Sequence, residues 1–143
     1  MNIVCSREEL LKGVTIVSKA VPTRTTMSIL ECILIDAYDD EIKLIANDME
    51  IGIETVINGR IIEHGVVAID AKYLSDVVRK LPDNDISIIT DDNYSTKIKC
   101  EKINLNYDIG KSGDDFAKIP FISRNEPIVI SQFALKELIK QTI

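Results

Sequence analysis

The fold is decided by a unit that first appears in residues 3–22, which read IVCSREELLKGVTIVSKAVP. Residues 3–5 form a short apolar run that is typical of a β-strand. Ser6 and Glu9 follow with the spacing of a capping box, in which the serine hydroxyl and the glutamate carboxylate both accept from backbone N–H groups at a helix start. This stretch therefore predicts a strand that leads directly into a helix.

An apolar stripe supports the helix that follows the cap. Leu10, Val14, Val17 and Val21 recur at helical spacing, so they lie on one face. Pro22 ends the pattern, because proline cannot continue a helix.

The same unit returns twice along the chain. Residues 66–69 read as a strand, Asp70 as a cap and Pro82 as the end of a helix. A third copy begins with residues 128–130 as the strand and Ser131 as the cap. The stripes of these two copies are Leu74, Val77, Val78 and Leu81, and then Leu135, Leu138 and Ile139. Self-similarity at a nearly fixed period, with caps 64 and 61 residues apart, predicts a repeated structural unit.

Strand-like runs separated by turn residues follow each of the first two helices. They are residues 33–35, 42–45 and 51–57, and then residues 86–89, 95–100 and 103–107. Each unit thus reads as strand, helix and three strands. The expected class is α+β, with the helices on one face of a mainly antiparallel sheet.

Two such units complete a domain over residues 1–120. We expect a linker at residues 121–126, and the first strand and helix of a second domain at residues 127–143. Because the third copy stops without a C-cap, the pattern favours an N-terminal fragment of a longer protein.

Composition limits the class of protein. The 143 residues carry a net charge of −6, with one His, three Cys and no Trp. The cysteines are odd in number and far apart, which argues against a disulfide framework or a metal knuckle and fits the cytoplasm. The overall acidity also argues against a simple nucleic-acid-binding module.

The charge is distributed unevenly. The three helical segments, residues 7–24, 71–81 and 132–143, hold nine basic and four acidic residues, whereas the remainder holds 8 basic and 19 acidic residues. The helices thus carry +5 and the remaining segments −11. Helical geometry turns the lysines away from the apolar stripes, so the positive surface is expected on the outer face of the helices and not on the sheet. Such a face is either merely solvated or binds phosphates without reading sequence.

No pattern of catalytic, metal-binding or cofactor-binding residues emerges. Residues 110–112 read Gly-Lys-Ser, but position 105, where a phosphate loop requires glycine, is Leu105. His64 has no second ligand at metal-binding spacing and is interpreted as a turn residue. The paired aspartates, of which Asp91 and Asp92 are one example, are interpreted as turn formers, with carboxylate metal catalysis as the minority alternative.

Five further stretches carry a family resemblance through their order and spacing. They are Ser6–Leu11, Val21–Thr26, Ala46–Ile51, Ala71–Pro82 and Asp115–Phe116. Together they resemble the N-terminal domain, with the first strand and helix of the second domain, of the bacterial DNA polymerase III beta subunits, the replicative sliding clamps.

The resemblance implies a ring-forming processivity factor that is not itself an enzyme. In that family the complete chain has three similar domains, two chains close head to tail around duplex DNA, and helices line the hole. The implied partners are double-stranded DNA in any sequence, a second copy of the chain, and the polymerase catalytic subunit and clamp loader. The last two are expected to bind through regions absent from these residues.

The resemblance also assigns residues to two surfaces. Arg24 matches a DNA-facing loop arginine of the family, and the helix faces add Lys12, Lys19, Lys72, Arg79 and Lys80 as DNA-binding candidates. The run Ile103, Asn104 and Leu105 resembles the subunit-interface strand.

Two positions depart from the family pattern, and two other functions remain open. Ser28 stands where the family commonly has proline, and Ala117 follows Phe116 where proline is usual. The first alternative is a stand-alone α+β interaction domain whose basic helix face docks on an acidic protein. The second is a hydrolase or nuclease that uses the aspartate pairs.

Overall fold

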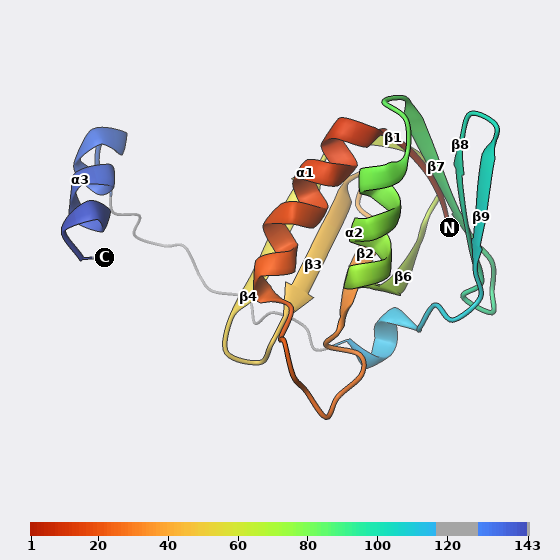
Figure 1. Cartoon of the computed structure of the whole chain (residues 1–143), viewed down its shortest axis with the longest axis horizontal. Coiled ribbons are helices and arrows are strands. Elements are labelled where there is room, and N and C mark those ends of the chain that lie inside the picture. The colour runs from red at the N-terminus through yellow and green to blue at the C-terminus, as the bar shows by residue number, and fades with distance from the viewer. Residues whose placement is uncertain (117–128, 143) are drawn as a thin grey trace.

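The computed structural model describes residues 1–116 and 129–142 (Figure 1). The elements run β1 (Asn2–Ser6), α1 (Arg7–Val17), η1 (Ser18–Ala20), β2 (Cys32–Ala37), β3 (Ile42–Asn47), β4 (Gly52–Ile57), β5 (Gly59–Glu63), β6 (Gly65–Asp70), α2 (Ala71–Lys80), β7 (Asp85–Thr90), β8 (Thr96–Cys100), β9 (Ile103–Tyr107), η2 (Gly113–Asp115) and α3 (Gln132–Thr142). The two strand–helix units expected before residue 120 are present, and the α+β class is confirmed.

The strands form two antiparallel sheets, where the sequence pattern predicted one. The five-stranded sheet has the order β5-β1-β7-β8-β9, and the four-stranded sheet has the order β4-β3-β2-β6. The extra strand is β5, which the sequence pattern did not predict. It is separated from β4 only by Asn58, where the chain passes from one sheet to the other.

Gly59 makes this passage feasible. A Cβ at Gly59 would lie 2.6 Å from the Cδ1 atom of Ile42 and 2.9 Å from the carbonyl oxygen of Val4. Since real Cβ atoms do not approach other atoms so closely, the corner needs a residue without a side chain.

One main core lies beneath the two helices and is shared by both sheets. The five-stranded sheet contributes Ile3, Ile88 and Ile98, and the four-stranded sheet contributes Ile35 and Leu44, all with 0% exposure. The predicted stripes face this core, since Leu10, Val14, Leu74 and Val78 are also fully buried. Burial of these apolar side chains is the main term that holds the helices against the sheets.

Both predicted N-caps are present, although one partner differs from the expectation. The Ser6 hydroxyl accepts from the backbone N–H of Glu9, and the Asp70 carboxylate accepts from that of Tyr73. The prediction that Glu9 reaches back to the start of its own helix was wrong. Its carboxylate accepts instead from the backbone and side-chain amides of Asn58, at 2.9 and 3.0 Å, because the β4–β5 corner offers these donors close by.

The described C-terminal residues, 129–142, contain the third predicted helix. Ser131 caps α3 by accepting from the backbone N–H of Ala134 at 3.1 Å. The strand expected at residues 128–130 is not observed at Val129 and Ile130, which lie outside any strand. A strand needs a hydrogen-bonded neighbour, and these two residues have none within the described ranges. Residue 128 and the predicted linker at 121–126 lie outside the described residues.

Candidate nucleic-acid interface

Helices α1 and α2 lie side by side and antiparallel over the core (Figure 1). Arg7, the first residue of α1, fixes their ends together. Its guanidinium donates from Nε to the carbonyl oxygen of Val78 and from Nη2 to that of Arg79, both at 3.0 Å. Sequence reasoning counted Arg7 only as a basic residue, and no local pattern reveals that it reaches a helix 71 residues away.

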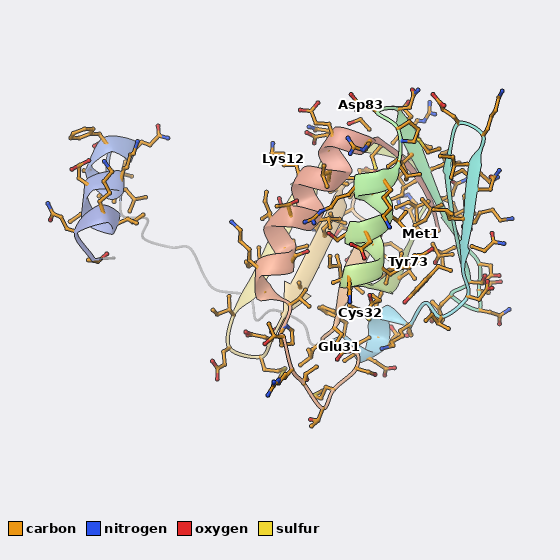
Figure 2. The ribbon with its side chains drawn as sticks, viewed as in Figure 1. Met1, Lys12, Glu31, Cys32, Tyr73 and Asp83 are labelled. Carbon is orange, nitrogen blue, oxygen red and sulfur yellow. The ribbon has the colours of Figure 1, made fainter. Side chains whose placement is uncertain are left out.

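The predicted DNA-binding side chains are exposed on this helical layer and on the loop that follows it. Lys12 is labelled on α1 in Figure 2. Because the buried stripe occupies the opposite side of each helix, the basic residues on α1 and α2 project into solvent. The exposed residues are Lys12, Lys19, Arg24, Lys72, Arg79 and Lys80.

The antiparallel pairing brings these residues into two groups. Lys19 follows the C-terminal end of α1, and Lys72 lies at the N-terminal end of α2, so both belong to the same end of the layer. Arg79 and Lys80 lie at the other end, beside Arg7. A ten-residue helix is about 15 Å long, so the layer presents positive charge over several phosphate spacings of a duplex.

These cations are largely uncompensated. None of the six forms an ion pair with a residue in 1–116 or 129–142. Glu9 is the acidic neighbour: the Asn58 backbone hydrogen bond lowers the pKa of its carboxyl, and the charge of Lys12 adds a smaller effect in the same direction. Exposed acids, Glu8 and Asp76, also lie on the helices, so the layer has a positive excess but is not uniformly positive.

The predicted interface strand, β9, is an edge of the five-stranded sheet. Residues 103–107 pair with β8 on one side, and within the described residues no strand pairs with the other side. Ile103 exposes 38% of its surface, Asn104 is exposed and Leu105 is half-buried. Unpaired backbone groups on such an edge can hydrogen-bond a strand from another chain.

A tyrosine pair links this edge strand to α2. The Tyr73 and Tyr107 rings stack with centroids 4.5 Å apart, and the Asp70 N–H donates to the Tyr107 hydroxyl at 3.2 Å. Burial raises the pKa of both tyrosines, so their hydroxyls stay protonated and remain hydrogen-bonding groups near neutral pH. The start of the basic helix α2 is thus fixed relative to the end of β9.

The residues considered for catalysis or metal binding make local contacts that stabilise turns and loops. Asp91 accepts from the backbone N–H groups of Asn93 and Ser95, as expected for a turn former. His64 lies between β5 and β6, where Nδ1 is 2.9 Å from the Ala37 carbonyl oxygen and the ring stacks on Tyr38. Among the described residues, no group of three or more His, Cys, Asp or Glu side chains converges on a metal site. The described helices are all too short or too polar to cross a bilayer.

The fold and the exposed basic helices define a class: an α+β domain built of two strand–helix units, with a helical layer that can contact phosphates. Residues 1–120 match the family model described as DNA polymerase III beta subunit, N-terminal domain. The chain therefore belongs to the DNA polymerase III beta subunit family.

Individual relatives agree with this assignment. The beta sliding clamp of Halalkalibacterium halodurans is 32% identical over 153 aligned residues, and that of Bacillus subtilis is 32% identical over 151. Both alignments cover 100% of this chain but only 40% of the relative. The chain thus spans about two fifths of the length of the curated relatives that it matches.

Solved structures show the same fold. A crystal structure described as a DNA polymerase III beta subunit, from Eubacterium rectale, superposes with a TM-score of 0.93 at 65% identity, covering 99% of this chain and 38% of that one. The crystal structure of the Bacillus subtilis sliding clamp superposes with a TM-score of 0.91 at 31% identity. The match covers 99% of this chain and 39% of the chain in that structure.

Proposed function

We propose that this chain supplies the first domain of a sliding clamp, a ring that encircles duplex DNA and keeps the replicative polymerase attached to it. The observation that carries the proposal is the family match over residues 1–120 together with the exposed basic layer on α1 and α2. A clamp must hold DNA without stopping on any sequence. Scattered lysines and arginines do this, because phosphate contacts carry no sequence information.

At residue level, Arg24, Lys12, Lys19, Lys72, Arg79 and Lys80 face the DNA phosphates. They act as a positive lining and not as base readers. The ring is a head-to-tail pair of chains in which the free edge of β9, including Ile103, Asn104 and Leu105, joins a strand of the second chain. The described geometry supports this through the unpaired side of β9.

The proposed role is non-catalytic. The domain positions DNA, and the chemistry belongs to the polymerase catalytic subunit, which together with the clamp loader binds segments outside these 143 residues. No cofactor is required, and the place of action is the cytoplasm, where bacterial DNA is replicated. The alternative of a stand-alone interaction domain is not favoured, because the relatives that match the whole chain are sliding clamps.

The proposal is tested by equilibrium binding of this chain to a fluorescein-labelled duplex of arbitrary sequence, followed by anisotropy at several salt concentrations. We expect dissociation constants of roughly 10⁻⁴ M or weaker at physiological salt, as for non-specific electrostatic binding. Replacing Lys12 and Lys72 with Gln should remove two phosphate contacts. The slope of log K against log salt should then fall by about 1.8.

Lys102, which is exposed on the β8–β9 turn, provides the matched control, and Lys102→Gln should leave the slope unchanged. A slope that falls with the Lys102 variant but not with the helix variants would contradict the assigned face. Binding at nanomolar concentration with a strong sequence preference would contradict the sliding function itself.

A further inference from the structure

The surface of the five-stranded sheet that faces away from the helices carries two lysines that the proposed function does not use. In β8, Thr96, Ile98 and Cys100 point into the core with 0%, 0% and 1% exposure, so Lys97 and Lys99 project from the opposite face. Both lysines are exposed. Exposed lysines thus lie on this sheet face as well as on the helices, where the sequence predicts the positive surface.

Neither lysine is neutralised within the described part of the chain. No residue in 1–116 or 129–142 forms an ion pair with Lys97 or Lys99, and neither ammonium has a hydrogen-bond partner there. Two ammonium groups on one strand face repel each other, so an anionic ligand between or above them is favourable.

Amide side chains accompany the lysines in register. Asn106 lies opposite Lys97, and Asn104 lies opposite Lys99, on the antiparallel neighbour β9. Directly opposed residues point to the same face, so each lysine has an amide beside it. The two pairs are separated by two residues of strand, about 7 Å.

Lys97, Lys99 and Asn106 border an open cavity of about 380 Å³, and Asn104 lies just outside its lining. Ile89 of β7, opposite Lys97, gives it an apolar element, and Ser95 and two carboxylates close one end. These carboxylates belong to Asp91 and Asp108, and Asp108 accepts from the Ser95 hydroxyl at 2.7 Å. The cavity therefore has donors along its length and negative charge at one end.

This arrangement selects a ligand by its spacing and charge. Each lysine–asparagine pair offers an ammonium and an amide N–H₂, which together match the two oxygens of one carboxylate. An extended peptide with acidic residues at alternate positions places its carboxylates about 7 Å apart on one side, the same spacing as the two pairs. A nucleic-acid strand fits less well. Its phosphates continue without a gap, so the phosphate beyond those bound by the lysines would lie beside Asp91 and Asp108 and be repelled by them.

We infer that the outer face of β8 and β9 binds an extended acidic segment of a partner protein, with Asp or Glu at alternate positions. The segment lies along β8 and presents one carboxylate to Lys97 and Asn106 and the next to Lys99 and Asn104. Its residue beside Asp91 and Asp108 is neutral or basic. This site lies on the side of the sheet opposite α1 and α2, and it is independent of the proposed contact with duplex DNA.

The test uses the labelled peptide GETETEG, with blocked ends, and the scrambled peptide GEETTEG, which has the same composition but no two Glu residues at alternate positions; each is titrated with the 143-residue chain at low salt. We expect the alternating peptide to bind more tightly than the scrambled one. Replacing Lys97 and Lys99 with Gln should weaken its binding about fivefold or more, whereas Lys102→Gln should change it less than about twofold. Amide chemical shifts should move on β8 and β9 and not on α1.

Several results would overturn the inference. They are equal affinity for the two peptides, equal affinity of the double variant and the unmodified chain, or shifts confined to the helices. Tighter binding of a single-stranded oligonucleotide than of the peptide through the same lysines would replace the acidic segment with nucleic acid. The variants that test duplex binding, at Lys12 and Lys72, lie on α1 and α2. The Lys97 and Lys99 double variant should therefore retain duplex binding. Failure of the acidic-segment proposal and failure of the proposed function can thus be distinguished.

Discussion

Arg7 offers the sharpest test of how the basic helical layer is held together. Its guanidinium donates to the carbonyl oxygens of Val78 and Arg79, in the last turn of α2. Carbonyls in the last turn of a helix have no intrahelical N–H partner. The residue that would supply one for Val78 is Pro82, which has no N–H group. Replacing Arg7 with Ala therefore leaves both carbonyls to water and removes the side-chain link between the start of α1 and the end of α2, although the backbone hydrogen bond from Arg7 to Asn84 remains.

The expected loss follows from these contacts. A hydrogen bond to a charged group contributes about 1.5–3 kcal/mol when buried and less when exposed. Here the Nε bond is partly buried and the Nη2 bond is exposed. A cation at a helix C-terminus adds about 0.3–1 kcal/mol. We expect Arg7→Ala to lower the free energy of unfolding by about 2 kcal/mol, and Arg7→Lys to lower it by about half as much, since lysine lacks the planar fork.

Urea denaturation followed by far-ultraviolet circular dichroism measures this effect. With an m value of about 2 kcal/mol per molar, the midpoint should fall by about 1 M for Arg7→Ala. Lys80→Ala is the matched control, because Lys80 is an exposed cation at the same end of α2 whose ammonium donates to no carbonyl oxygen within residues 1–116 and 129–142. Its midpoint should change by less than the equivalent of about 0.5 kcal/mol. An Arg7→Ala midpoint within that same range, at unchanged m, would refute the reasoning.

Three further outcomes are expected. Gly13→Ala should destabilise the domain by about 1 kcal/mol despite the better helix propensity of alanine, because its Cβ would lie 2.6 Å from a buried side chain of β4; a higher urea midpoint would contradict this. The pKa of Glu9 is lowered in the folded state, so its stabilising effect is present above the unfolded pKa and is lost as the pH falls through the folded pKa. Glu9→Gln should therefore have a lower urea midpoint than the unmodified chain at pH 6, and this difference should shrink toward pH 3; a constant difference would contradict the assignment. All three cysteines should resist a thiol reagent at pH 8 until urea unfolds the chain. The reason is that burial raises the pKa of each thiol, and that of Cys5 to about 12. Rapid labelling of any cysteine in the folded chain would contradict this. The residues concerned are Cys5, Cys32 and Cys100.

The helices were predictable because their signals are local. Ser6 and Asp70 are each followed at once by an apolar stripe of period 3.6, and both cap as expected. Their exposed cations could be placed on the outer face for the same reason, since the direction of a helical side chain follows from its position relative to the stripe.

The division of the strands into two sheets was not predictable from the same signals. No residue pattern before Asn58 indicates that β4 and β5 belong to different sheets. Their assignment depends on the strands with which they pair: β4 pairs with β3, whereas β5 pairs with β1, which is distant in sequence. Glu9 shows the same limit at the scale of one side chain. Its spacing from Ser6 satisfies the capping-box pattern, but the Asn58 donors that it binds are 49 residues away.

The two basic surfaces differ in what the sequence reveals about them. Lys12 and Lys19 are seven residues apart, as are Lys72 and Arg79, and a spacing of seven returns to the same helix face. Lys97 and Lys99 are two residues apart and share a strand face just as surely. Yet a sheet has two faces, and only the tertiary structure shows that the helices cover the face of Ile98 and leave that of the lysines open. A net charge of −6 is thus compatible with two separate cationic surfaces, because the sign of a surface depends on which side chains share a face and not on the sum over the chain.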